Sequence, residues 1–105
     1  MSVAVKICGL TTPETVAAAL DAGADMLGFV FFDKSPRHIA PDAAARLAAP
    51  ARGRAQIVAL TVDADDAALG EIVAALAPDV IQLHGRETPQ RCAAIRARLG
   101  LPVMK

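Results

Sequence analysis

An alternation of short apolar stretches with helix-like segments constrains the fold of this chain more than any other feature. Four apolar stretches, short and mostly aliphatic or aromatic, have the pattern of buried strands. They span residues 3–8, 25–32, 55–62 and 79–84. Each is followed by an alanine-rich segment of helical length, and a fifth apolar stretch opens at 103–105. Four such units in tandem predict parallel strands joined by right-handed helical crossovers.

Capping residues mark where the helices begin. A threonine followed by proline opens two of the helical segments, because the threonine side chain can cap the helix and proline fits the first helical position. We expect the four helices to begin at Pro13, near Asp42 (running to Ala49), after Asp63 or Asp65, and at Pro89. The pattern of strand, loop, helix and turn is thus complete in every unit.

Two architectures fit this pattern, an open doubly wound sheet with helices on both faces and part of an eight-stranded (β/α)8 barrel with helices only outside. Side chains alternate between the faces of a strand, so Lys6 and Cys8 share one face of the first strand. In the same way Gln82 and His84 share one face of the fourth. Helices on both faces would require apolar residues on both. A barrel accepts polar side chains inside, near its active end, so the alternation favours the barrel.

Three places are expected at one rim of the sheet, because ligands bind at the carboxyl ends of the strands in both architectures. They are Cys8, the loop 33–39 and His84. A Cys8 thiolate could act as nucleophile or base if a cation such as Lys6 lowered its pKa. A free cysteine can equally be a small buried hydrophobic residue. His84 could be an acid, a base or a hydrogen-bond donor, or a structural imidazole.

Arg37, in the loop after the second predicted strand, is a candidate for binding an anionic ligand. Its guanidinium suits a planar carboxylate or a phosphate, although arginines on exposed loops often have no specific role. His38 beside it is expected to face away, towards solvent. Gln82 is expected to be an interior polar residue that orients a neighbour, and Cys92 is interpreted as a packing residue within a helix.

Composition excludes several classes of function. The 11 basic and 11 acidic residues leave a formal net charge of +0, so the basic surface of a nucleic-acid-binding protein is not expected. No long apolar run predicts a membrane span, and two cysteines in a chain without secretory features indicate reduced thiols and a cytoplasmic location. The dinucleotide, P-loop and HExxH motifs do not occur, and no metal site is expected.

Three motifs carry a resemblance to a known family. “KICG” at 6–9, “GFVF” followed by “SPR” at 28–37, and “QLHG” at 82–85 occur in this order and spacing. With them the whole chain closely resembles the amino-terminal half of phosphoribosylanthranilate isomerase, a single (β/α)8 TIM barrel. The resemblance implies that residues 1–105 are the truncated amino-terminal half of one such domain, with four βα units and the start of strand five.

The resemblance also implies a reaction, the Amadori rearrangement of N-(5-phosphoribosyl)anthranilate to 1-(2-carboxyphenylamino)-1-deoxyribulose 5-phosphate in tryptophan biosynthesis, with no cofactor or metal. By motif, Cys8 would be the general base, Arg37 would hold the anthranilate carboxylate, and His84 would line the substrate pocket. Lys6 and Gln82 are further candidates for substrate binding. The general acid, an aspartate, and the phosphate-binding loops would lie outside this chain, so activity is expected only of the complete barrel, as monomer or homodimer.

Two other functions stay open at this point. One is a non-catalytic half-barrel that assembles with a complementary half, because repeated βα units can associate edge to edge. The other is a different phosphosugar-processing enzyme on a related barrel. Metal ligands or a different acid in the rest of the barrel would favour this last possibility.

Overall fold

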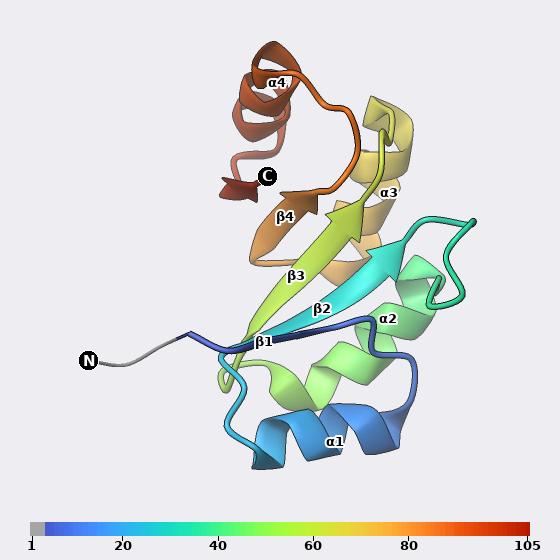
Figure 1. The fold of residues 1–105 in the computed structure, drawn as a ribbon, viewed down its shortest axis with the longest axis vertical. Coiled ribbons are helices and arrows are strands. Elements are labelled where there is room, and N and C mark those ends of the chain that lie inside the picture. Colours follow the sequence, from blue (N-terminus) through green and yellow to red (C-terminus); the bar gives the residue numbers. More distant parts are fainter. Residues whose placement is uncertain (1–3) are drawn as a thin grey trace.

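Five parallel strands follow one another across a single sheet in the order of the chain, β1-β2-β3-β4-β5 (Figure 1). The structure is a computed structural model, and it describes residues 4–105. The strands are β1 (Lys6–Cys8), β2 (Met26–Phe31), β3 (Gln56–Thr61), β4 (Val80–Leu83) and β5 (Val103–Met104). A doubly wound sheet reverses its strand order at a switch point, whereas this order runs on without reversal, as in a barrel.

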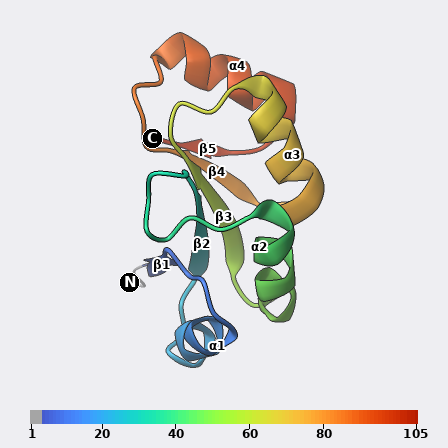
Figure 2. The same ribbon diagram turned by 90° about the vertical axis from the view of Figure 1, so that its right-hand side faces the viewer.

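Helices connect each strand to the next. They are α1 (Pro13–Asp21), α2 (Pro41–Ala48), which continues into a short 3-10 turn, η1 (Ala49–Ala51), α3 (Asp66–Leu76) and α4 (Pro89–Leu99). Figure 2 shows them along the outer side of the curved sheet. Within residues 4–105, no helix combines the length and the apolar character needed to cross a membrane.

The predicted caps form at the helix starts. The Thr12 hydroxyl accepts the backbone N–H of Thr15 at 3.2 Å, and Thr88 caps α4 in the same way. Of the two aspartates available for α3, Asp65 is the cap, since its carboxylate accepts the N–H of Ala68 at 2.8 Å. The prediction for α2 is off by one residue at each end, because Pro41 takes the first helical position and Ala49 begins the 3-10 turn.

The outer face of the sheet carries the core. Apolar strand side chains that are fully buried against the helices are Leu27, Phe29, Ile57, Ala59, Ile81 and Leu83, and the polar Thr61 is fully buried on the same face. Side chains of residues that are paired across parallel strands point to the same face of the sheet. The strand register therefore identifies the residues of the opposite, inner face. These are Lys6, Cys8, Met26, Gly28, Val30, Gln56, Val58, Leu60, Val80, Gln82 and Met104.

The first strand departs from its prediction as a buried strand. Val5 is 47% exposed and Ile7 is 38% exposed. The reason is that β1 pairs on one side only, with β2, and that the small side chains of α1 cover its outer face incompletely. An open groove of about 540 Å³ lies there, with Ile7 on one wall and Ala18 and Ala22 on the other. Val3, where the predicted strand began, lies outside the described residues.

Two aspartates hold the amino-terminal ends of the strands together. The carboxylate of Asp25, just before β2, accepts the N–H of Val5 at 2.7 Å, while its own N–H donates to the Val5 carbonyl at 2.8 Å. Asp79, just before β4, makes the same pair of bonds to Ile57 at the start of β3, at 2.7 and 2.8 Å. The sequence reasoning did not single out either aspartate, although each stands directly before a predicted strand.

Candidate active site

Cys8 lies at the carboxyl end of β1, where the neighbouring strand has a glycine. Cys8 pairs with Gly28 of β2, and a Cβ atom at Gly28 would lie 2.9 Å from the Cys8 sulfur. A glycine inside a strand often marks such a close approach. The missing side chain at Gly28 makes room for the Cys8 sulfur. The sequence analysis did not single out this glycine.

The loop after β2 brings Arg37 next to Cys8. Gly9 has φ +80, and the arginine side chain lies so close to it that a Cβ there would collide with the Arg37 Cδ and come within 3.1 Å of Nη1. The loop is held by the Ser35 hydroxyl, which accepts the Arg37 N–H at 3.1 Å, and by the Ile39 N–H, which donates to the Val30 carbonyl at 3.1 Å. The Arg37 side chain therefore lies against the residue that follows Cys8, and both residues line the groove beside β1.

Lys6 and Gln82 meet on the inner face although they come from β1 and β4. The Lys6 ammonium donates a hydrogen bond to the Gln82 side-chain oxygen. This contact spans the two intervening strands, so the sheet must curve to bring its first and fourth strands within reach. Gln82 was expected to be an interior polar residue that orients a neighbour, and the neighbour that it contacts is Lys6.

His84 follows directly on the carboxyl end of β4, and its side chain is exposed. Its backbone N–H donates to the Thr61 carbonyl at 2.9 Å, which continues the β3–β4 pairing to the rim. His84 therefore extends the polar row that begins with Gln82 on this face.

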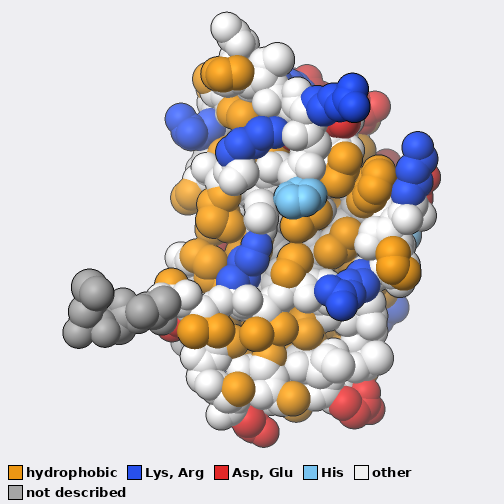
Figure 3. Space-filling model, viewed as in Figure 1, with side chains coloured by type: hydrophobic (Ala, Val, Ile, Leu, Met, Phe, Trp, Pro, Cys, Tyr) orange, Lys and Arg blue, Asp and Glu red, His pale blue; other side chains and the backbone are white. Residues whose placement is uncertain are grey.

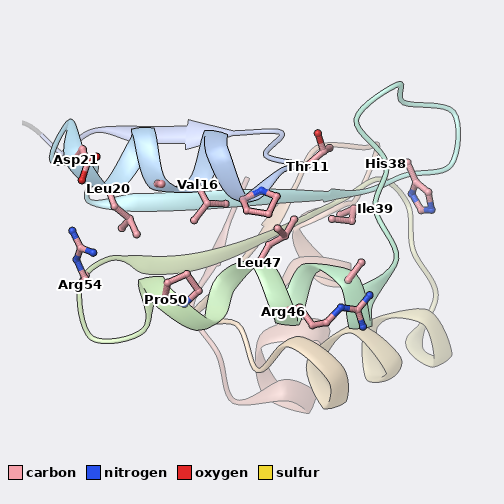
Figure 4. A pocket seen from close by; sticks show the side chains of 13 residues that line it. Thr11, Val16, Leu20, Asp21, His38, Ile39, Arg46, Leu47, Pro50 and Arg54 are labelled. Carbon is pink, nitrogen blue, oxygen red and sulfur yellow. The ribbon is translucent and has the colours of Figure 1, made fainter.

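His38 belongs to another part of the surface. It lies at one end of a groove of about 590 Å³ between α1 and α2, where Val16 and Leu20 face Leu47 and Pro50 (Figure 4). Arg37, its neighbour in sequence, lines the groove beside β1 instead. Arg37 and His38, although adjacent in sequence, thus line two different grooves.

Two basic side chains, Lys6 and Arg37, belong to the candidate site. Lys6 shares the face of Cys8 on β1, and Arg37 lines a groove together with Cys8. Figure 3 shows basic side chains and a histidine among apolar ones, with acidic side chains mainly at the margins. Among residues 4–105, no three His, Cys, Asp or Glu side chains group as metal ligands would. The arrangement offers a thiol, a guanidinium and an ammonium to an anionic organic molecule.

A buried carboxylate beneath the rim was missed by the sequence reasoning. Glu87 follows His84 by three residues, and its side chain is 3% exposed. Burial raises the pKa of Glu87, but the hydrogen bonds from Lys105 and from backbone N–H groups, including those of Asp63 and Gly85, outweigh burial and leave this pKa below its usual value. The only feature of the local sequence that could have indicated this contact is an acidic residue two positions after Gly85, the glycine in the turn after β4.

The sequence of this chain matches a known protein family over almost its whole length. A family model described as N-(5'-phosphoribosyl)anthranilate (PRA) isomerase matches residues 5–105. The chain belongs to this family. The isomerase of Brucella canis is 65% identical over 105 residues, which are 100% of this chain and 47% of the relative. The chain therefore spans about half the length of the curated isomerases that it matches.

Solved structures of the isomerase family have the same fold over this length. A phosphoribosylanthranilate isomerase in complex with reduced 1-(o-carboxyphenylamino)-1-deoxyribulose 5-phosphate superposes with a TM-score of 0.89 at 32% identity, covering 97% of this chain and 52% of that one. The isomerase of Thermus thermophilus gives 0.87 at 34% identity, over 96% and 50%. These neighbours confirm the predicted resemblance and the TIM-barrel fold class.

Proposed function

We propose that the complete protein is an isomerase that converts N-(5-phosphoribosyl)anthranilate to 1-(2-carboxyphenylamino)-1-deoxyribulose 5-phosphate in tryptophan biosynthesis. The observation that carries the proposal is the placement of the Arg37 side chain against Gly9, the residue after Cys8, in a groove that Arg37 and Cys8 both line. A carboxylate clamp and a base at one strand end are what this substrate requires. A solved relative in complex with a reduced carboxyphenylamino sugar phosphate supports the substrate class.

In the proposed reaction a general acid protonates the ring oxygen, and the bond from that oxygen to C1′ breaks to leave a Schiff base. The Cys8 thiolate then removes the C2′ proton, and the electron pair of that bond moves toward the iminium nitrogen. Tautomerisation of the resulting enolamine returns a proton to C1′. C2′ is oxidised to a ketone while C1′ is reduced, so the redox change is internal and no cofactor is required by the balance.

The other candidates would bind the substrate. Arg37 would pair its planar fork with the anthranilate carboxylate, an arrangement in which two parallel hydrogen bonds fix orientation. His84 would line the pocket at the end of β4. Lys6, held by Gln82, would place a positive charge on the face where the thiolate must form, since a nearby cation favours the charged form of a cysteine.

The remaining parts of the proposal concern the complete protein. We propose that residues 1–105 form the amino-terminal half of one TIM-barrel domain and that the rest of the barrel supplies the aspartate acid and the phosphate-binding loops. The share of the relatives that this chain covers, 47% for the Brucella protein, supports this division. A cytoplasmic location, the absence of a cofactor, and a monomer or homodimer remain predictions.

Cys8→Ala in the complete protein tests the proposed function. We expect kcat to fall by about 10²- to 10⁴-fold, the usual contribution of a positioned base, with KM within about threefold of the wild-type value. Steady-state kinetics with N-(5-phosphoribosyl)anthranilate measure both constants. The matched control is Cys92→Ala, the same change at a half-buried position on α4, which should leave kcat unchanged. Near-wild-type turnover by Cys8→Ala would remove Cys8 from the mechanism.

A further inference from the structure

The Glu87 carboxylate, which the proposed mechanism does not use, is saturated with hydrogen bonds. One oxygen accepts the N–H of Gly85 at 2.8 Å and the ammonium of Lys105 at 3.0 Å. The other oxygen accepts the N–H of Asp63 at 2.9 Å. A nearly buried carboxylate with three donors is a fixed part of the structure, because charge-assisted bonds of this kind are strong and directional.

The three donors come from three successive strand ends. Asp63 follows β3, Gly85 follows β4, and Lys105 follows β5. Two further bonds close the cluster, since the Asp63 carboxylate accepts the N–H of Arg86 at 2.8 Å and the Lys105 ammonium also donates to the Gly85 carbonyl at 2.7 Å. Glu87 therefore holds the rim loops of three neighbouring strands to one another.

The turn at Gly85 is shaped for this contact. A Cβ atom at residue 85 would lie 2.6 Å from the Asp63 carboxylate, so only glycine fits there. Asp63 itself has φ 50, in the left-handed region that Asp tolerates better than most residues. Both features serve the close approach of the two loops.

The backbone on both sides of His84 is held as a result. Its own N–H is bonded to the Thr61 carbonyl at 2.9 Å, and the next residue, Gly85, is held through its N–H by Glu87 and through its carbonyl by Lys105. The His84 side chain is exposed at the rim. Its place there is consequently set by the backbone that this cluster fixes.

We propose that Glu87 is a positioning residue, which holds the Gly85 turn against the ends of β3 and β5 and thereby sets the place of His84 at the rim. The proposal rests on the proposed function, in which His84 lines the substrate pocket. Glu87 does not contact the substrate in this arrangement, because it is buried and both its oxygens already accept hydrogen bonds. Its effect on the reaction passes through His84.

Glu87→Gln in the complete protein tests this. The amide presents an N–H₂ group to backbone N–H donors, so at least one of the three bonds is lost while the shape of the side chain is kept. We expect KM to rise about three- to tenfold with kcat within about twofold, as for a binding contact that is displaced. Glu71→Gln, the same change at an exposed position on α3, is the matched control and should alter neither constant.

A double-mutant cycle with His84→Ala separates positioning from general structural support. If Glu87 acts through His84, adding Glu87→Gln to His84→Ala leaves KM within about twofold of the His84→Ala value, because the side chain to be positioned is already gone. If KM of the double variant rises by the product of the factors seen in the two single variants, the two residues act independently and the proposal is overturned. If Glu87→Gln does not fold, Lys105→Gln takes its place in the same cycle, with the same two outcomes.

An NMR measurement without substrate keeps this test independent of the proposed function. The His84 imidazole resonances are assigned by their loss in His84→Ala, and we expect them to shift in Glu87→Gln and to stay in place in Glu71→Gln. Unchanged His84 resonances in Glu87→Gln would refute the positioning role whatever the enzyme catalyses. A shift in a protein whose Cys8→Ala variant retains full turnover would support positioning while the proposed mechanism fails.

Discussion

At the scale of single residues, Thr61 has a buried hydroxyl that makes no hydrogen bond to the described part of the chain. Its side chain is 0% exposed and, within residues 4–105, its Oγ1 has no hydrogen-bond partner. It is paired with Phe31 and Leu83 across the sheet, so it faces the apolar layer under the helices. A buried hydroxyl that makes no hydrogen bond costs free energy, because it has lost its bonds to water.

Thr61→Val should therefore stabilise the protein. Valine has nearly the same shape and removes the unpaired hydroxyl, so we expect the free energy of unfolding to rise by about 1 kcal/mol. Urea unfolding of the complete protein measures this change. Thr11→Val, at an exposed position, makes the same atomic exchange and should stay within about 0.5 kcal/mol of wild type. A loss of stability in Thr61→Val would mean that the hydroxyl has a partner in the complete protein.

At the scale of elements, the strands are joined in pairs by Asp25 and Asp79. Each carboxylate occupies the N–H at the start of the preceding strand, where a parallel ladder would otherwise leave a donor unpaired. The two aspartates lie at equivalent places, before the second strand of each pair. The repeated contact fixes the register at the amino-terminal edge, opposite the rim that carries the site.

Asp79→Ala should destabilise the fold through this contact. The part-buried N–H of Ile57 loses its acceptor, so we expect a loss of about 1–3 kcal/mol in the free energy of unfolding. Asp79→Asn keeps an oxygen that can accept the same bond and should lose less. Chemical denaturation of the three proteins gives the comparison, with Asp33→Ala in an exposed loop as a neutral control. Equal losses for alanine and asparagine would argue against the hydrogen bond as the cause.

Features of the helices and loops could be predicted from the sequence where the contacts that cause them join residues close together in the chain. The Thr12 and Thr88 caps bond to N–H groups three residues on, so adjacent letters were enough to find them. The choice between two aspartates for α3 could not be made, because Asp63 is engaged by Glu87 from another loop. Gly28 and Glu87 were missed for the same reason, since their contacts cross between strands.

At the scale of the whole molecule, the sheet is only partly covered on its inner face, and β1 has a neighbour on one side only. Alternation put Lys6 and Cys8 on one face of the first strand, as the register has them. The exposure of Val5 and Ile7 depends on what lies beside that strand, which the local sequence pattern does not contain. In the proposed barrel this face becomes the interior. The base and the carboxylate clamp then lie on one half and the acid and phosphate loops on the other.

The 105-residue chain alone should therefore behave differently from the complete protein. We expect it to bind a hydrophobic dye more strongly, because apolar residues of its first strand and inner face, such as Ile7 and Leu60, are partly exposed, and to show no turnover of the anthranilate substrate. Co-expression with the separately encoded second half should restore activity if the halves associate. Dye fluorescence, size-exclusion chromatography and an activity assay follow these changes. Turnover by the 105 residues alone would contradict the proposed division of the site.

The aspartate contacts described at the strand starts have a kinetic consequence. The Asp25 carboxylate reaches back 20 residues and the Asp79 carboxylate 22, so each joins a strand to its immediate predecessor in the chain. Contacts over such short separations close loops quickly, and folding rates rise as contacts become more local. We therefore expect these contacts to form early, and the contact of Lys6 with Gln82, which spans 76 residues, to form only after the four strands have come together.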